Sequence, residues 1–159
     1  MVVRTNFLIK CWILSLCFMI FSSFAFAETT MNTQSVAGYW QTINKKTKKP
    51  SSIIHIKQNG EFYEGRIIKT FPSPGESKTK ICVGCTGAQK GKPILGLTII
   101  KNMVCQSRAC EHGTILDPRD GKLYHATMHL INQGMALKVR GYVGIPLFGK
   151  TVVWQRVSH

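Results

Sequence analysis

The sequence predicts an all-β fold: a single antiparallel eight-stranded up-and-down barrel that follows an N-terminal signal peptide, with a β-sandwich as the alternative. Runs of β-branched and aromatic residues are separated at short intervals by clusters of Gly, Pro, Asn and Asp, which is typical of short antiparallel strands. No segment after the first 27 residues has the apolar periodicity of an amphipathic helix. A closed barrel is preferred because closure leaves no unpaired sheet edges.

Eight segments have the composition of strands. Asn59-Gly60, between the second and third, is the strongest short hairpin signal, and the stretch from Asp117 to Gly121 is a turn by composition. The sixth segment alternates clearly, with Ala126 and Met128 on one face and His125 on the other, so one of its sides is buried. The expected strands cover residues 36–43, 52–58, 61–71, 94–101, 113–116, 122–131, 136–142 and 150–157.

Residues 1–27 are predicted to be a cleaved signal peptide. Two basic residues accompany an apolar run over residues 11–24, and Ala25-Phe26-Ala27 is a small-x-small cleavage site. The run is shorter than the roughly 20 residues of a membrane anchor. A lipoprotein site at Cys17 is the weaker alternative, because the leucine before it is bulky. We therefore expect a single domain over residues 28–159, periplasmic or secreted, with no membrane span after cleavage.

Removing those 27 residues and their two basic side chains from 159 leaves 132 residues with a formal charge of +12. A chain of this size can bury one core. Nucleic acid is not an expected partner, because the protein is predicted to be exported and no aromatic residues interleave with its lysines.

Five short sequence motifs, taken in their order along the chain, carry a family resemblance. They are Gly38-Tyr39-Trp40-Gln41-Thr42, Cys82-Val83-Gly84-Cys85, Gly113-Thr114-Ile115-Leu116-Asp117-Pro118, Leu137-Lys138-Val139-Arg140-Gly141-Tyr142 and Leu147-Phe148-Gly149-Lys150-Thr151. In these motifs the chain resembles a bacterial exported family, domain of unknown function 2147, over nearly the whole predicted domain. The resemblance implies a lipocalin-like barrel and implies no particular activity or cofactor. The chain departs from the family at Cys105 and Cys110 and in the lysine-rich segment 45–49.

Trp40, Trp154 and Arg156 are the predicted barrel-closing residues. The first and last strands of an antiparallel barrel must pair, which brings these three side chains together. Gly-x-Trp at the start of the barrel also resembles the lipocalin signature, in which the tryptophan packs under a late arginine and fills the closed end. A guanidinium over an indole is favourable by ~0.5–2 kcal/mol. Stacking of a ligand on the tryptophans is the alternative.

Four cysteines remain in the predicted domain: Cys82 and Cys85 in a long connection, and Cys105 and Cys110 across a likely hairpin turn. Export to an oxidising compartment favours disulfides, and pairing within each couple is the first expectation. Cross-pairing, a tetrahedral zinc site and a redox-active pair are the alternatives. The long connection, over residues 72–93, is expected to be functional because of its length and its cysteines.

The predicted topology gathers eleven basic residues against three acidic ones at one barrel end, opposite Trp40. Such a basic rim would attract anions and anionic surfaces, although lysine-rich turns are also common as plain solvated surface. The candidate basic rim consists of Lys45, Lys46, Lys48, Lys49, Lys78, Lys80, Lys90, Lys92 and Lys150, with Arg119 and Lys122 beside them.

The sequence offers few candidate catalytic residues. Only two carboxylates fall on a predicted strand, and they point to opposite faces, so a convergent acid/base pair is not expected. The segment 144–151 matches the phosphate-loop pattern, but a strand rather than a helix follows it. The sequence therefore predicts an exported barrel without cofactor or metal that binds a small apolar or anionic amphiphilic ligand or an envelope component. A filled-core interaction module of the cell envelope is the first alternative, and a thiol-disulfide or hydrolytic enzyme is a more remote one.

Overall fold

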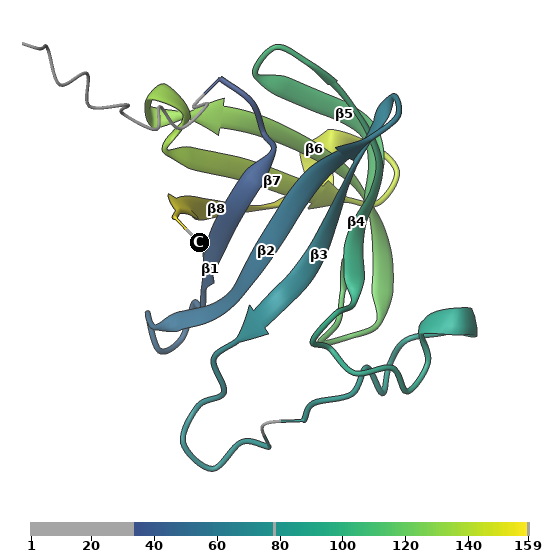
Figure 1. Ribbon diagram of the computed structural model, residues 1–159. Coiled ribbons are helices and arrows are strands. Elements are labelled where there is room, and N and C mark those ends of the chain that lie inside the picture. The colour runs from purple at the N-terminus through teal and green to yellow at the C-terminus, as the bar shows by residue number, and fades with distance from the viewer. Residues whose placement is uncertain (1–33, 78, 159) are drawn as a thin grey trace, which may run out of the picture. The chain divides into compact units, whose positions relative to one another are not determined.

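The computed structural model describes residues 34–77 and 79–158, which form a closed antiparallel barrel of eight sequential strands (Figure 1). β1 pairs with β2 on one side and with β8 on the other. This confirms the predicted barrel over the sandwich. The predicted signal peptide and Lys78 lie outside the described residues. Within those residues, no helix is long and apolar enough to cross a bilayer.

The strands cover β1 (Gly38–Ile43), β2 (Pro50–Asn59), β3 (Phe62–Thr70), β4 (Thr98–Gln106), β5 (Ala109–Asp117), β6 (Lys122–Ile131), β7 (Ala136–Tyr142) and β8 (Lys150–Val157). The last three have the predicted bounds. The prediction is wrong for β4, which begins at Thr98 rather than at residue 94, and for both β4 and β5 at the other end, because they extend much farther toward their shared turn. Asn102 in β4 and His112 in β5 have positive φ angles of 57° and 63°, which interrupt the strand alternation that the sequence pattern relies on. The ladder resumes beyond them and continues to Gln106 and Ala109.

The up-and-down order gives the barrel two distinct ends. The end that carries the connections 44–49, 71–97, 118–121 and 143–149 is called the rim end, because these connections hold the basic rim. The opposite end carries residues 34–37, the short turns 60–61 and 107–108, and the segment 132–135, and it is called the closed end. Figure 1 shows the long connection between β3 and β4 extending away from the strands.

Arg156 holds the closed end together. Its guanidinium donates to the carbonyl oxygens of Gly134 (2.7 Å), Ala37 (3.1 Å) and Ser35 (2.6 Å), and it lies 4.3 Å from the ring centre of the fully buried Trp40. The glycine of Gly-x-Trp leaves room for this guanidinium, because a Cβ at Gly38 would lie 2.7 Å from Nη1 of Arg156. Burial lowers the pKa of Arg156 from its ordinary value, but a guanidinium stays charged in proteins.

The barrel interior is filled by side chains. Ile100 and Met103 of β4 are fully buried, and they occupy the space over glycines of the two neighbouring strands. A Cβ at Gly65 would lie 3.0 Å from Ile100, and a Cβ at Gly113 would lie 2.1 Å from Sδ of Met103. Met128, Leu137, Val139, Trp40 and Trp154 belong to the same cluster. An eight-stranded barrel has room either for packed side chains or for one small ligand, and here the side chains take it.

Replacing Arg156 with Met should lower the free energy of unfolding by about 2–4 kcal/mol, because three carbonyls lose a charged donor and the indole loses its cation. Lys138→Met removes an exposed cation from β7 and is the control, expected within about 0.5 kcal/mol of the unsubstituted protein. Urea unfolding followed by near-ultraviolet circular dichroism measures both. A loss below about 1 kcal/mol at Arg156 would show that the closed end does not depend on this side chain.

Candidate functional site

The turn 44–49 displays four lysines on an ordered backbone. Asn44 fixes it: its Oδ1 accepts hydrogen bonds from the backbone N–H groups of Lys46 (2.9 Å) and Thr47 (3.2 Å), and its carbonyl accepts one from Lys48 (2.8 Å). Two ion pairs occur among the described residues, Glu76–Lys80 and Asp117–Arg119. The lysines of this turn therefore carry charge that no described carboxylate neutralises.

The long connection between β3 and β4 is an ordered structure. The backbone N–H of Cys82 donates to Lys92 (2.8 Å), that of Gly91 donates to Cys82 (3.0 Å), and that of Ile94 donates to Lys80 (2.8 Å), so the connection folds back on itself. A disulfide joins Cys82 and Cys85, and both cysteines are buried.

This connection is seated on the turn between β5 and β6. A Cβ at Gly121, whose φ is +71°, would lie 1.9 Å from the backbone carbonyl of Gly84, and a Cβ at Gly84 would lie 2.7 Å from the carbonyl oxygen of Asp120. Sγ of Cys82 lies 3.6 Å from the carbonyl oxygen of Pro118. The two segments thus meet backbone to backbone, and a glycine at each position is a steric requirement.

Asp117 stabilises that turn. Burial would raise the pKa of its carboxyl, but hydrogen bonds from the Arg119 side chain and backbone N–H outweigh this and hold the pKa below its ordinary value, with help from the charge of Lys150. The Asp120 carboxylate accepts a hydrogen bond of 2.8 Å from the hydroxyl of Tyr124 and thereby raises the pKa of that tyrosine.

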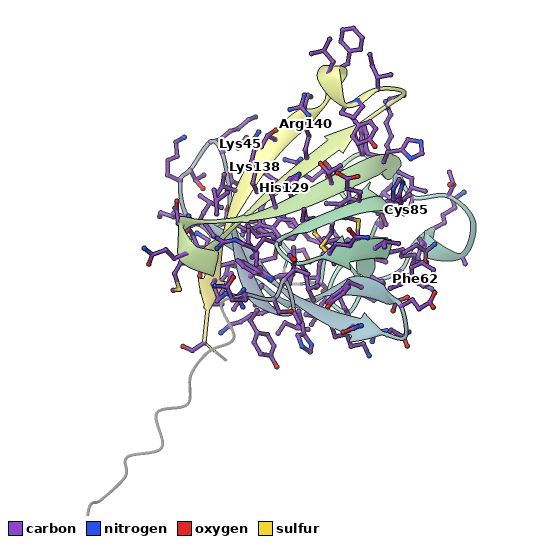
Figure 2. All side chains as sticks on the ribbon, turned by 90° about the horizontal axis from the view of Figure 1, so that it is seen from above. Lys45, Phe62, Cys85, His129, Lys138 and Arg140 are labelled. Carbon is purple, nitrogen blue, oxygen red and sulfur yellow. A yellow bond between two sulfur atoms is a disulfide. The ribbon has the colours of Figure 1, made fainter. Side chains whose placement is uncertain are left out.

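The segment 143–149 is held in shape by Arg140 of β7. The guanidinium donates to the carbonyl oxygens of Pro146 (2.7 Å) and Leu147 (2.9 Å) and to the hydroxyl of Thr151 (2.8 Å). Figure 2 shows this segment projecting beyond the strands at the top of the view, with Arg140 at its base. The segment lies at the rim end, and we call residues 143–148 the apolar tip because four of its side chains, Val143, Ile145, Leu147 and Phe148, are exposed and apolar.

Exposed apolar side chains concentrate at the rim end. Nine of the thirteen exposed large apolar residues among those described lie there, which makes this end apolar as well as basic. They are Ile43, Ile81, Val83, Leu95, Leu123, Val143, Ile145, Leu147 and Phe148. The lysines of the basic rim are predictable from the sequence, but these apolar residues and Arg140 were not among the predicted site residues. An apolar Ile-Pro-Leu-Phe stretch between two glycines was the available signal; its match to the phosphate-loop pattern was rejected, and the segment was expected to be a glycine-bounded hairpin.

Two open hollows mark the described surface at this end. One, of about 200 Å³, lies between β3 and the long connection, where Arg66 and Lys92 stand beside Thr98 and Leu95. The other, of about 160 Å³, lies next to the apolar tip and is lined by Leu123, Tyr142 and Val143 among others. Neither is lined by the tryptophans or methionines of the core. Both hollows therefore lie on the outside of the barrel.

The remaining predicted residues take other positions. Cys105 and Cys110 form a second disulfide across the β4–β5 hairpin at the closed end, so both couples pair internally and the alternatives of cross-pairing and a four-cysteine zinc site do not apply. Trp154 lies in the core beside Leu137, its partner in the strand ladder. Of the basic rim, Lys80 forms an ion pair with Glu76. The hydrogen bond from Lys80 is the largest cause of the lowered pKa of the Glu76 carboxyl.

Comparison with known proteins places this barrel in a family. Residues 38–156 match the model of a family described as an uncharacterized protein conserved in bacteria, DUF2147. The chain belongs to this family. No curated protein matches the DUF2147 barrel described here at a significant level. It is similar to the solved structure of HP1028 from the human pathogen Helicobacter pylori, a protein stated to belong to the lipocalin family. The TM-score is 0.66 at 20% identity, over 79% of this chain and 84% of that one. At this identity the likeness shows the fold alone.

Gly121→Ala should unseat the long connection. A positive φ costs a non-glycine residue ~1–2 kcal/mol, and the clash with Gly84 adds about 1–3 kcal/mol. Gly91→Ala is the matched control, because Gly91 has nearly the same φ, +72°, and open space around it. Hydrogen exchange at the Cys82 N–H should accelerate strongly in the first variant and little in the second. Equal effects would mean that the two segments do not press on one another.

Asp117 should make the fold acid-sensitive. Because its pKa is lowered in the folded protein, its contribution is fully present above about pH 4 and is lost as the pH falls through the lowered value. Since the carboxylate is partly exposed, the contribution is below about 1 kcal/mol. The difference in unfolding free energy between neutral pH and about pH 3 should therefore be slightly smaller in Asp117→Asn than in the unsubstituted protein. Parallel pH profiles of the two proteins would contradict this.

Proposed function

We propose that this protein is an exported binding protein of the cell envelope, and that it binds anionic amphiphiles at its rim end rather than inside the barrel. The observation that carries the proposal is the coincidence, at one end, of uncompensated lysines with exposed apolar side chains. Amphiphiles with acidic headgroups present the complementary pair of features, one charged and one apolar.

The packed interior supports a surface site over an internal one. Lipocalin-like barrels can hold a small ligand within their walls, but here Ile100 and Met103 occupy that space. The proposal therefore joins two of the functions expected from the sequence, a ligand with an acidic headgroup and a filled-core module that docks on the envelope. The hollow beside Arg66 and Lys92 offers two cations and a hydroxyl to such a headgroup.

Export is part of the proposal and rests on the predicted signal peptide and the two disulfides. Disulfides persist in oxidising compartments such as the periplasm and are rare in the cytosol. A thiol-disulfide activity gains no support, because both Cys82 and Cys85 are buried, whereas reactive cysteines are accessible.

Replacing Lys45, Lys46 and Lys49 together with Gln should weaken binding to anionic vesicles. Each lysine near an anionic surface contributes about 1 kcal/mol, so the triple variant should bind at least about tenfold more weakly. Added salt should likewise weaken vesicle binding by the unsubstituted protein. Flotation with phosphatidylglycerol–phosphatidylcholine vesicles measures this, with pure phosphatidylcholine as the uncharged reference.

The matched control replaces Lys57, Lys101 and Lys138 with Gln. These exposed lysines lie on β2, β4 and β7, away from the four connections of the rim end. The control has the same net charge as the test variant and should bind nearly as the unsubstituted protein does. Equal losses in the two variants would show that total charge, not the rim end, controls binding. No binding by the unsubstituted protein would reject the proposal.

A further inference from the structure

We propose that the apolar tip, residues 143–148, inserts into the hydrocarbon edge of an anionic phospholipid bilayer, so that the protein docks on an intact membrane surface. This inference rests on the proposed function and names its partner. It depends on four properties of the tip: its shape, its side chains, its backbone and its surroundings.

The tip presents its apolar side chains outward on a rigid backbone. Leu147 and Phe148 are 75% and 77% exposed, and Figure 2 shows the segment protruding beyond the strands. A Cβ at Gly149 would lie 2.8 Å from the carbonyl oxygen of Gly141 and 3.0 Å from Nε of Arg140. The base of the tip is thus packed tightly on β7 while its apex stays free. Rigid display reduces the ordering cost of binding.

Around the apex of the tip, several backbone polar groups that a bilayer would leave unsatisfied already have partners. Pro146 has no N–H, its carbonyl accepts from Arg140 and from the N–H of Gly149 (3.1 Å), and the N–H of Phe148 donates to Ile145 (3.3 Å). The carbonyl of Leu147 is bound by Arg140 as well. Unpaired backbone groups are the main obstacle to placing a loop in hydrocarbon, and the guanidinium removes much of that obstacle.

The surroundings of the tip suit the headgroup layer. Lys150 lies two residues after the tip, and Tyr142 directly precedes the tip and lines the adjacent hollow with Leu123. Tyrosine is enriched where membrane meets water, and lysines attract anionic lipid. A second copy of the chain is a poorer occupant, because two apolar tips meeting would bring two basic rims together.

The test places a fluorescent reporter at the tip. In the exported chain with Phe148→Trp, emission should shift to shorter wavelength on adding phosphatidylglycerol–phosphatidylcholine vesicles, and lipids brominated along their acyl chains should quench it by about twofold. The core tryptophans are present in every variant, so the unsubstituted protein supplies the background. Phe62→Trp, at the exposed Phe62 near the closed end, is the matched control and should be neither shifted nor quenched (Figure 2).

A second variant tests the energetics without a reporter. Leu147→Ser with Phe148→Ser should weaken vesicle binding by about tenfold or more through lost apolar burial, whereas Val153→Ser, on the exposed side of β8, should have little effect. Circular dichroism establishes that each variant is folded.

The outcomes separate this inference from the proposed function. Vesicle flotation without quenching at position 148 would leave the electrostatic binding intact and overturn the insertion. A blue shift without vesicles, accompanied by a concentration-dependent mass in sedimentation, would assign the tip to self-association and also overturn it. Absence of any vesicle binding would reject both proposals together.

Discussion

The barrel depends on one buried cation. Arg156 lies on the last strand, yet its three hydrogen bonds end on residues before the first strand and on the segment between β6 and β7. A single guanidinium therefore joins the two strands whose pairing closes the sheet to the segments that cover its end. Because the charge would be costly to bury alone, the carbonyls and the indole of Trp40 must be supplied together. This arrangement leaves the opposite end free of any structural duty in closure.

Because closure depends on the opposite end, the rim end can expose clustered lysines and apolar side chains that would otherwise destabilise the fold. Lysines that repel one another and aliphatic side chains in water each disfavour a compact state, and here they sit on turns whose backbones are fixed locally, by Asn44 in one case and by Arg140 in another. The long connection is similarly fixed by a disulfide and by its glycine contact with the β5–β6 turn. The rim end thus displays its lysines and apolar side chains on turns held by local contacts, while Cys82 and Cys85 anchor the long connection in the core.

The sequence predicts the architecture well because the relevant signals are local. Turn residues, strand alternation and the Gly38-x-Trp40 phrase all act over a few positions, and the disulfide pairings follow from the short separations within each couple. The ends of β4 and β5 were mispredicted because Asn102 and His112 adopt left-handed conformations that interrupt alternation. Whether the barrel is hollow could not be predicted, since it depends on Ile100 and Met103 lying over glycines of neighbouring strands. The apolar tip was missed for a related reason: its exposure is set by Arg140, several residues away.

The hydrogen bonds of Arg140 have one more consequence. Two of the three go to main-chain oxygens of the segment between β7 and β8, so its shape depends little on which side chains stand at its apex. Homologous chains that retain the arginine and the two flanking glycines could exchange Leu147 and Phe148 for other residues without refolding the loop. The loop would keep its backbone conformation while the chemistry of its exposed side chains changed.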